Sequence, residues 1–133
     1  MKRFLNASMS LCVVAMVAAL LLQAGGVEAA GAALFKQLNA VAAVSAHNIW
    51  AVGYSISGSG EQPLIEHWDG TKWSILPSPN SGPTADDALD GVTAISPNNV
   101  WAVGSNMNTG STPGQSLIEH WDGVQWSIVS SAN

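Results

Sequence analysis

Two copies of the motif Glu-His-Trp-Asp hold most of the side chains in this chain that could do chemistry. They occupy residues 66–69 and 119–122. His67 and Asp69 stand two positions apart, so in an extended strand they would project from the same face. There, an imidazole and a carboxylate could bind a metal ion or transfer a proton.

We favour a structural interpretation, because a catalytic centre in a repeat fold is usually single whereas this motif occurs twice. In each copy the aspartate precedes a glycine, a pair that favours a tight turn: the aspartate accepts backbone hydrogen bonds and the glycine permits positive φ. The sequence therefore predicts a protein that is not an enzyme, with no catalytic residue, metal site or cofactor. The positions assigned to the fold are Trp50, Gly53, His67, Asp69, Gly70, Trp101, Gly104, His120, Asp122 and Gly123.

All six tryptophans stand at matched positions of the two copies. Exposed indole rings can stack on sugars, whereas buried rings supply the largest packing areas. We favour packing for Trp50 and Trp101, and we expect Trp68 and Trp73 to face each other across two strands. The candidates for ligand binding combine the other four rings with polar residues nearby: Trp68, Trp73, Trp121, Trp126, Tyr54, Asn106 and Asn108.

Two segments, residues 54–63 and 105–116, differ between the copies in length and sequence and are rich in Gly, Ser and Asn. Loops on a rigid scaffold are common sites of recognition, and uncharged polar side chains suit hydrogen bonding to glycans or protein surfaces. The alternative is that they are ordinary surface loops. Residues 77–90 are expected to form the crossing between the copies, with Asp86 and Asp87 in solvent.

A longer repeat surrounds the motif. Trp-Ala-Val-Gly at residues 50–53 returns at 101–104, so the period is about fifty residues. Such a period indicates one supersecondary unit stacked on its neighbours. Short β-branched and aromatic runs, bounded by Asn, Asp, Gly and Pro, predict four strands per copy. These are residues 41–45, 49–54, 64–68 and 73–76, then 92–96, 100–104, 117–121 and 126–129.

We therefore expect an all-β fold of two four-stranded antiparallel β-propeller blades, an incomplete propeller, preceded by a helical signal peptide. Residues 1–29 are assigned to the signal peptide, 30–37 to a lead-in, 38–88 to the first blade and 89–133 to the second. A closed propeller has typically 4–8 blades, about twice this number or more. A truncated gene product, several chains in one ring, or a partner that supplies blades would each account for the difference.

The order of these blocks resembles a kelch repeat: an apolar strand ending in Gly53, a variable loop, residues 66–70, Trp73, then Leu76 and Pro77. The chain is also similar to secreted bacterial propellers with Trp-Ala-Val-Gly and His-Trp-Asp-Gly repeats. Kelch units usually carry a Gly-Gly pair, whereas Tyr54 follows Gly53 here, so we describe the repeat as kelch-like. The resemblance covers residues 38–130 and implies propeller blades.

The N-terminus predicts secretion. Lys2 and Arg3 precede an apolar run over residues 11–22, which includes the single cysteine, and small residues follow it. This is the pattern of a signal peptide, with cleavage expected after Ala29; a retained anchor is the alternative. The remaining chain has two lysines and no arginine against eight carboxylates, a net charge of −6. Nucleic acid is excluded as a partner, because binding it needs a basic patch.

We expect a secreted or cell-surface protein, extracellular or periplasmic, that binds a protein or a glycan without catalysis. After cleavage it would not contact a membrane, and it would associate with itself or with further blades. The alternatives are a remnant of a propeller enzyme and a lectin that closes its ring by oligomerisation. Sialidase-type chemistry needs an arginine cluster that the chain lacks, and a copper site of the galactose-oxidase type needs a cysteine-linked tyrosine.

Overall fold

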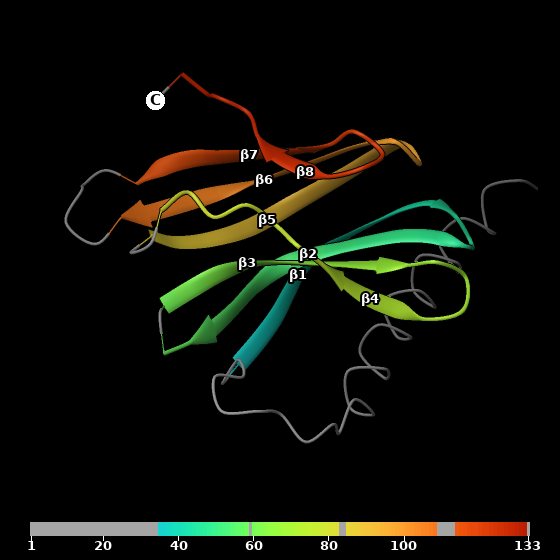
Figure 1. The fold of residues 1–133 in the computed structure, drawn as a ribbon, viewed down its shortest axis with the longest axis horizontal. Helices are drawn as coiled ribbons and strands as arrows, with labels where there is room; N and C mark the ends of the chain where they lie inside the picture. The colour runs from blue at the N-terminus through green and yellow to red at the C-terminus, as the bar shows by residue number, and fades with distance from the viewer. Residues whose placement is uncertain (1–34, 59, 83–84, 109–113, 133) are drawn as a thin grey trace, which may run out of the picture. The chain divides into compact units, whose positions relative to one another are not determined.

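The computed structural model describes residues 35–58, 60–82, 85–108 and 114–132. Within these ranges the regular elements are β-strands, and they form two four-stranded antiparallel sheets (Figure 1). The all-β prediction is confirmed at this level. The predicted signal peptide lies outside the described residues. No helix among the described residues has the length and apolar character needed to cross a bilayer.

Each sheet contains the strands of one repeat, hydrogen-bonded in chain order. The first sheet consists of β1 (Phe35–Ser45), β2 (Asn48–Ser57), β3 (Gly60–Trp68) and β4 (Trp73–Leu76). The second consists of β5 (Ala85–Ser96), β6 (Asn99–Asn108), β7 (Gln115–Trp121) and β8 (Trp126–Ile128). Inner strands β2 and β6 each begin with an asparagine, followed by the apolar runs Ile-Trp-Ala-Val and Val-Trp-Ala-Val.

Several strands are longer than the sequence predicted. The β2–β3 ladder continues past Tyr54 to Ser57 and Gly60, so most of residues 54–63 is strand, not loop. β5 already begins at Ala85, within the range assigned to the first blade and its crossing. Polar residues such as Ser55 and Gln62 fill these extensions, and they show no apolar alternation that would have predicted strands.

The repeated glycine at the end of Trp-Ala-Val-Gly lies where two strands approach closely. A Cβ atom on Gly53 would lie 1.9 Å from the carbonyl oxygen of Gln37, and one on Gly104 would lie 1.9 Å from that of Ala88. Both positions adjoin a register shift in the ladder with the preceding strand. Only glycine fits this approach, which explains why both repeats carry it.

Each sheet has two unlike faces, because successive side chains on a strand point to opposite sides. One face carries a single tryptophan of the central strand, Trp50 or Trp101; we call it the single-Trp face. The other carries a cross-strand pair, Trp68–Trp73 or Trp121–Trp126; we call it the paired-Trp face. The register is the same in both sheets, since Trp50 pairs with His67 and Trp101 with His120.

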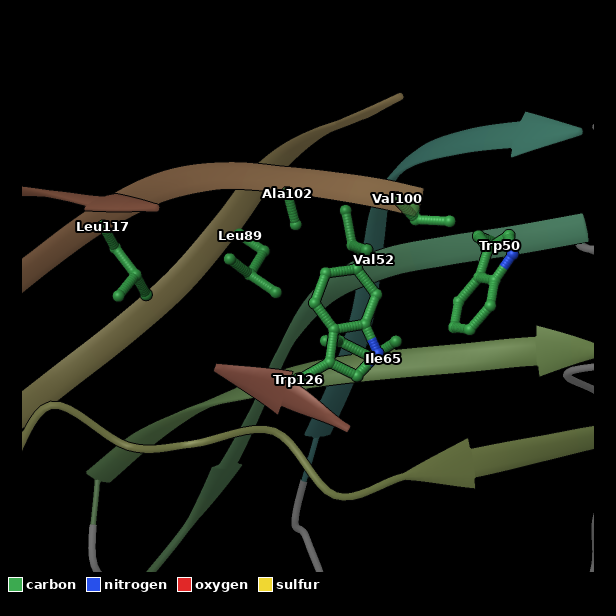
Figure 2. Packing of buried hydrophobic residues seen from close by; sticks show 8 residues of the cluster. All are labelled: Trp50, Val52, Ile65, Leu89, Val100, Ala102, Leu117 and Trp126. Atoms are coloured by element: carbon green, nitrogen blue, oxygen red, sulfur yellow. The ribbon is translucent and has the colours of Figure 1, made fainter. Parts of the chain in front are cut away.

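The sheets pack through unlike faces: the single-Trp face of the first lies against the paired-Trp face of the second. Trp50 is 1 % exposed, and its ring centroid lies 5.3 Å from that of Trp121 and 5.6 Å from that of Trp126. Strand β5 contacts β1, β2 and β3 across the junction. Figure 2 shows the resulting core, with these members: Trp50, Val52, Ile65, Leu89, Val100, Ala102, Leu117 and Trp126.

Candidate functional site

The two aspartates of the repeated motif close the turns that follow β3 and β7. Asp69 Oδ1 accepts hydrogen bonds from the backbone N–H of Thr71 (2.8 Å) and Lys72 (3.0 Å) and from the Thr71 hydroxyl (2.6 Å). Asp122 Oδ1 accepts the same two backbone bonds from Val124 and Gln125. These donors satisfy the carboxylates, so the turn interpretation accounts for both residues.

Hydrogen bonding also keeps these carboxylates ionised. The Thr71 hydroxyl, with the two backbone N–H groups, lowers the pKa of Asp69 to about 2. The pKa of Asp122 is lowered by the backbone N–H groups of Gln125 and Val124. The following glycines have φ of 99° at Gly70 and 98° at Gly123, which confirms the predicted positive φ.

The two histidines of the motif lie on tryptophan rings. His67 stacks on Trp50, and His120 on Trp101, each with ring centroids 4.2 Å apart and planes tilted by 34°. His120 Nε2 lies 3.0 Å from Asn99 Oδ1. Burial lowers the pKa of His67, partly offset by Asp69, so His67 favours the neutral form. No group of three potential metal ligands occurs among the described residues.

The four tryptophans named as ligand candidates have different surroundings. Trp126 is 6 % exposed and, with Trp121, packs against Trp50, so this pair is part of the junction. Trp68 and Trp73 face each other as expected, with centroids 5.8 Å apart, and both are only half-buried. The indole N–H of Trp68 donates to the carbonyl of Ala46. Of the two pairs, the first sheet's is the one open to another molecule.

Glu119 is the most unusual titratable residue at the junction. It is fully buried, and its two carboxylate oxygens lie 3.0 and 2.8 Å from the Ser78 hydroxyl, which donates to them. Burial raises the pKa of Glu119 to about 7. The Ser78 hydrogen bond lowers this pKa in part, and the charge of Asp87 makes a smaller contribution that raises it. Its counterpart Glu66 is half-buried. Burial raises the pKa of Glu66, and the positive charge of Lys36 partly offsets this increase.

A polar network joins the sheets at the end where β5 begins. Buried Asp87 accepts hydrogen bonds at 2.7 Å from both the backbone N–H and the hydroxyl of Ser81. Asp86 accepts one from the backbone N–H of Glu61, in the other sheet. The prediction that both aspartates lie in solvent is wrong, since Asp87 is fully buried and Asp86 half-buried.

The three remaining ligand candidates lie on β2 and β6. The Tyr54 hydroxyl donates to Gln37 Oε1 (3.3 Å), and its ring lies 6.2 Å from that of Phe35. The buried Asn106 amide donates to Ser81 Oγ, while its Oδ1 atom has no partner among the described residues. Asn108 is the last residue of β6. Of these three, Asn106 belongs to the polar network.

The sequence missed the two buried carboxylates. Glu119 stands in an identical motif to Glu66, and Asp87 in a run rich in Gly, Pro, Ser and Asp that indicates a loop. Their burial comes from the packing of one sheet on the other, so no local pattern could have identified them. Comparison with protein-family models, curated proteins and solved structures finds no match for this chain.

Proposed function

We propose that the chain is a secreted or surface-exposed, non-enzymatic binding module whose two sheets are blades of a kelch-like β-propeller. The observation that carries the proposal is the packing of two sheets with the same repeated motifs through unlike faces, Trp50 against Trp121 and Trp126. A propeller stacks its blades in this way around an axis. The ring would be completed by further blades or copies of the chain.

The absence of catalysis in this proposal is supported by how the reactive side chains are used. The Asp69 carboxylate is occupied by turn hydrogen bonds, and the His67 ring lies on Trp50. A general base must reach a proton on a substrate, and a nucleophile needs a base beside it. Neither arrangement exists at the repeated motif among the described residues. A remnant of a propeller enzyme is the alternative, with the chemistry lost and the scaffold kept.

The polar end of the sheets is the proposed binding surface for a glycan or a protein. Exposed Asn80 donates to Gln62, and Ser81 holds Asp87 and Asn106 beside them. These contacts hold amide and hydroxyl groups in fixed positions, which lowers the entropy lost on binding a polar ligand. Uncharged hydrogen-bonding groups suit sugar hydroxyls and peptide backbones alike.

A glycan array and a pull-down from the surrounding medium would test this function with the full chain, purified as a secreting host releases it. Asn80→Ala should weaken binding by about tenfold if the amide contacts the ligand. Asn98→Ala removes an exposed amide at the opposite end of β6 and should bind as the wild type does. If neither glycans nor proteins bind, or if both variants lose binding equally, the proposed surface is wrong.

The second candidate is a lectin that stacks a sugar on the half-buried pair Trp68–Trp73. It is favoured by the tilted geometry of these rings, with an interplanar angle of 42° and centroids 5.8 Å apart. On that hypothesis Trp73→Ala would abolish glycan binding and Asn80→Ala would leave it unchanged. The two variants therefore separate the two surfaces.

A further inference from the structure

We infer that copies of this chain associate head to tail, with the single-Trp face of the second sheet docking on the paired-Trp face of the first sheet of a second copy. The contact would repeat the one already formed inside the chain. It rests on the proposed function, in which further blades or copies complete the ring, and it names the two surfaces that would meet.

The single-Trp face of the second sheet lacks the cover that its counterpart has. Val52 is fully buried in the junction, whereas Val103, at the same place in the second sheet, is 49 % exposed. Trp50 is 1 % exposed, and Trp101 is only half-buried. The central Trp, Val, His and Ile of the two faces stand in the same register, so the neighbouring sheet accounts for the difference at these positions.

The paired-Trp face of the first sheet shows the reciprocal difference on β3 and β4. Trp73 and Glu66 are half-buried, whereas their counterparts Trp126 and Glu119 are buried in the junction. Further along the same strands, counterparts such as Leu64 and Leu117 are buried in both sheets. The docking surface on the first sheet is therefore centred on β3 and β4, around Trp68 and Trp73.

A second copy of this chain is the occupant that fits both faces. In the junction, a face carrying Trp, Val and Ile accepts a face carrying two cross-strand tryptophans. The chain presents one more single-Trp face, and around Trp68 and Trp73 it presents a half-exposed part of one more paired-Trp face. These two surfaces are complementary to each other, not to themselves. Trp101 would pack on Trp68 and Trp73 of the next copy, and Ser131, the counterpart of Ser78, would approach Glu66 there.

Such a contact is heterologous, so each copy uses one surface to bind forward and another to bind backward. It closes into a ring when the rotation between copies divides a full turn and otherwise continues as a filament. A face-to-face dimer, in which both copies use the same surface, is not compatible with it. This difference gives a decisive experiment.

The experiment measures the mass of the full chain, purified as released by a secreting host, by light scattering and sedimentation from about 1 μM to about 1 mM. We expect the mass to increase with concentration. Val103→Glu places a charge in the contact and should shift association to concentrations at least about tenfold higher. Val124→Glu is the matched control, since Val124 is 83 % exposed and lies in the β7–β8 turn, off both faces.

Mixing two variants tests the head-to-tail arrangement. Trp73→Ala damages the paired-Trp face of the first sheet and leaves the single-Trp face of the second sheet intact. Val103→Glu does the reverse. At concentrations where the wild type associates, each variant alone should remain monomeric, and their mixture should form dimers that grow no further. Val103→Ser, which adds no charge, replaces Val103→Glu if circular dichroism shows that the glutamate variant is unfolded.

Three results would overturn the inference. The wild type could remain monomeric up to about 1 mM, as it would if another protein or further blades cover these faces. Val103→Glu and Val124→Glu could have equal effects, which would place the contact elsewhere. The mixture of Val103→Glu and Trp73→Ala could fail to dimerise, which would exclude a head-to-tail contact.

Discussion

At the scale of single residues, the repeated aspartate and glycine build turns, and this gives the first prediction. Gly70 has a φ of 99°, and an added Cβ would lie 2.7 Å from His47 Nδ1. Gly70→Ala should therefore lower the free energy of unfolding by at least about 1 kcal/mol. Urea denaturation followed by circular dichroism measures it.

Gly58→Ala is the matched control for this substitution. A Cβ on Gly58 would meet no atom within 4 Å, and its φ is not positive. Its stability should equal that of the wild type or exceed it slightly, because alanine restricts the unfolded chain. Equal effects of the two substitutions would show that the Asp-Gly turn imposes no conformational demand.

A second prediction at this scale concerns the pH dependence produced by Glu119. Its pKa is raised to about 7 in the folded chain and is near 4.5 when exposed. Below both values the residue is neutral in both states and carries no penalty. As pH rises towards 7, the unfolded chain ionises first, so stability falls over this window and stays lower above it.

Glu119→Gln should remove this pH dependence. The amide keeps an oxygen that can accept the Ser78 hydrogen bond and carries no charge. The variant should be more stable than the wild type by about 1–3 kcal/mol at pH 8 and similar to it at pH 4. Urea titrations at these two pH values provide the measurement. If the difference in unfolding free energy between variant and wild type is the same at both pH values, the burial argument is contradicted.

At the scale of strands and sheets, the sequence predicted the features that depend on local residue patterns. The repeated Trp-Ala-Val-Gly and Asp-Gly blocks identify four strands in each copy, the turns and the cross-strand pairing of Trp68 with Trp73. It did not predict the extensions of β2, β3 and β5, because polar pairs such as Ser55 and Gln62 carry no periodic signal. It also could not predict the burial of Asp87, which comes from the packing of one sheet on the other.

The third prediction compares the two central tryptophans, which have the same partners within their sheets. Each indole N–H donates to an asparagine, Asn48 or Asn99, and each ring stacks on a histidine. Only Trp50 also contacts the other sheet. Trp50→Ala should therefore cost about 3 kcal/mol or more, and Trp101→Ala clearly less.

The measurement for this pair is urea denaturation at low protein concentration, where any association between copies is avoided. The two variants remove the same side chain from the same register, so their difference reports the contact between the sheets. If both lose equal stability, the intersheet packing of Trp50 contributes little. If Trp101→Ala is the less stable variant, the assignment of the junction is wrong.

At the scale of the whole molecule, the two sheets share one core and so should unfold together. Val52 and Ile65 of the first sheet lie in the same cluster as Leu89 and Val100 of the second. The polar network adds hydrogen bonds between the sheets, among them that from the Glu61 N–H to Asp86. Neither sheet can lose its structure without exposing the junction face of the other.

The last prediction follows from this shared core. Gly70→Ala in the first sheet and Gly123→Ala in the second should each shift a single unfolding transition, with the same midpoint by tryptophan fluorescence and by circular dichroism. Each turn is local to its own sheet, and the two share no partner, since an added Cβ would meet His47 in one and Asn98 in the other. The losses in free energy of unfolding should therefore add in the double variant, to within about 0.5 kcal/mol. Two separate transitions, each moved by only one of the substitutions, would show that each sheet is stable alone and that the junction contributes little to the fold.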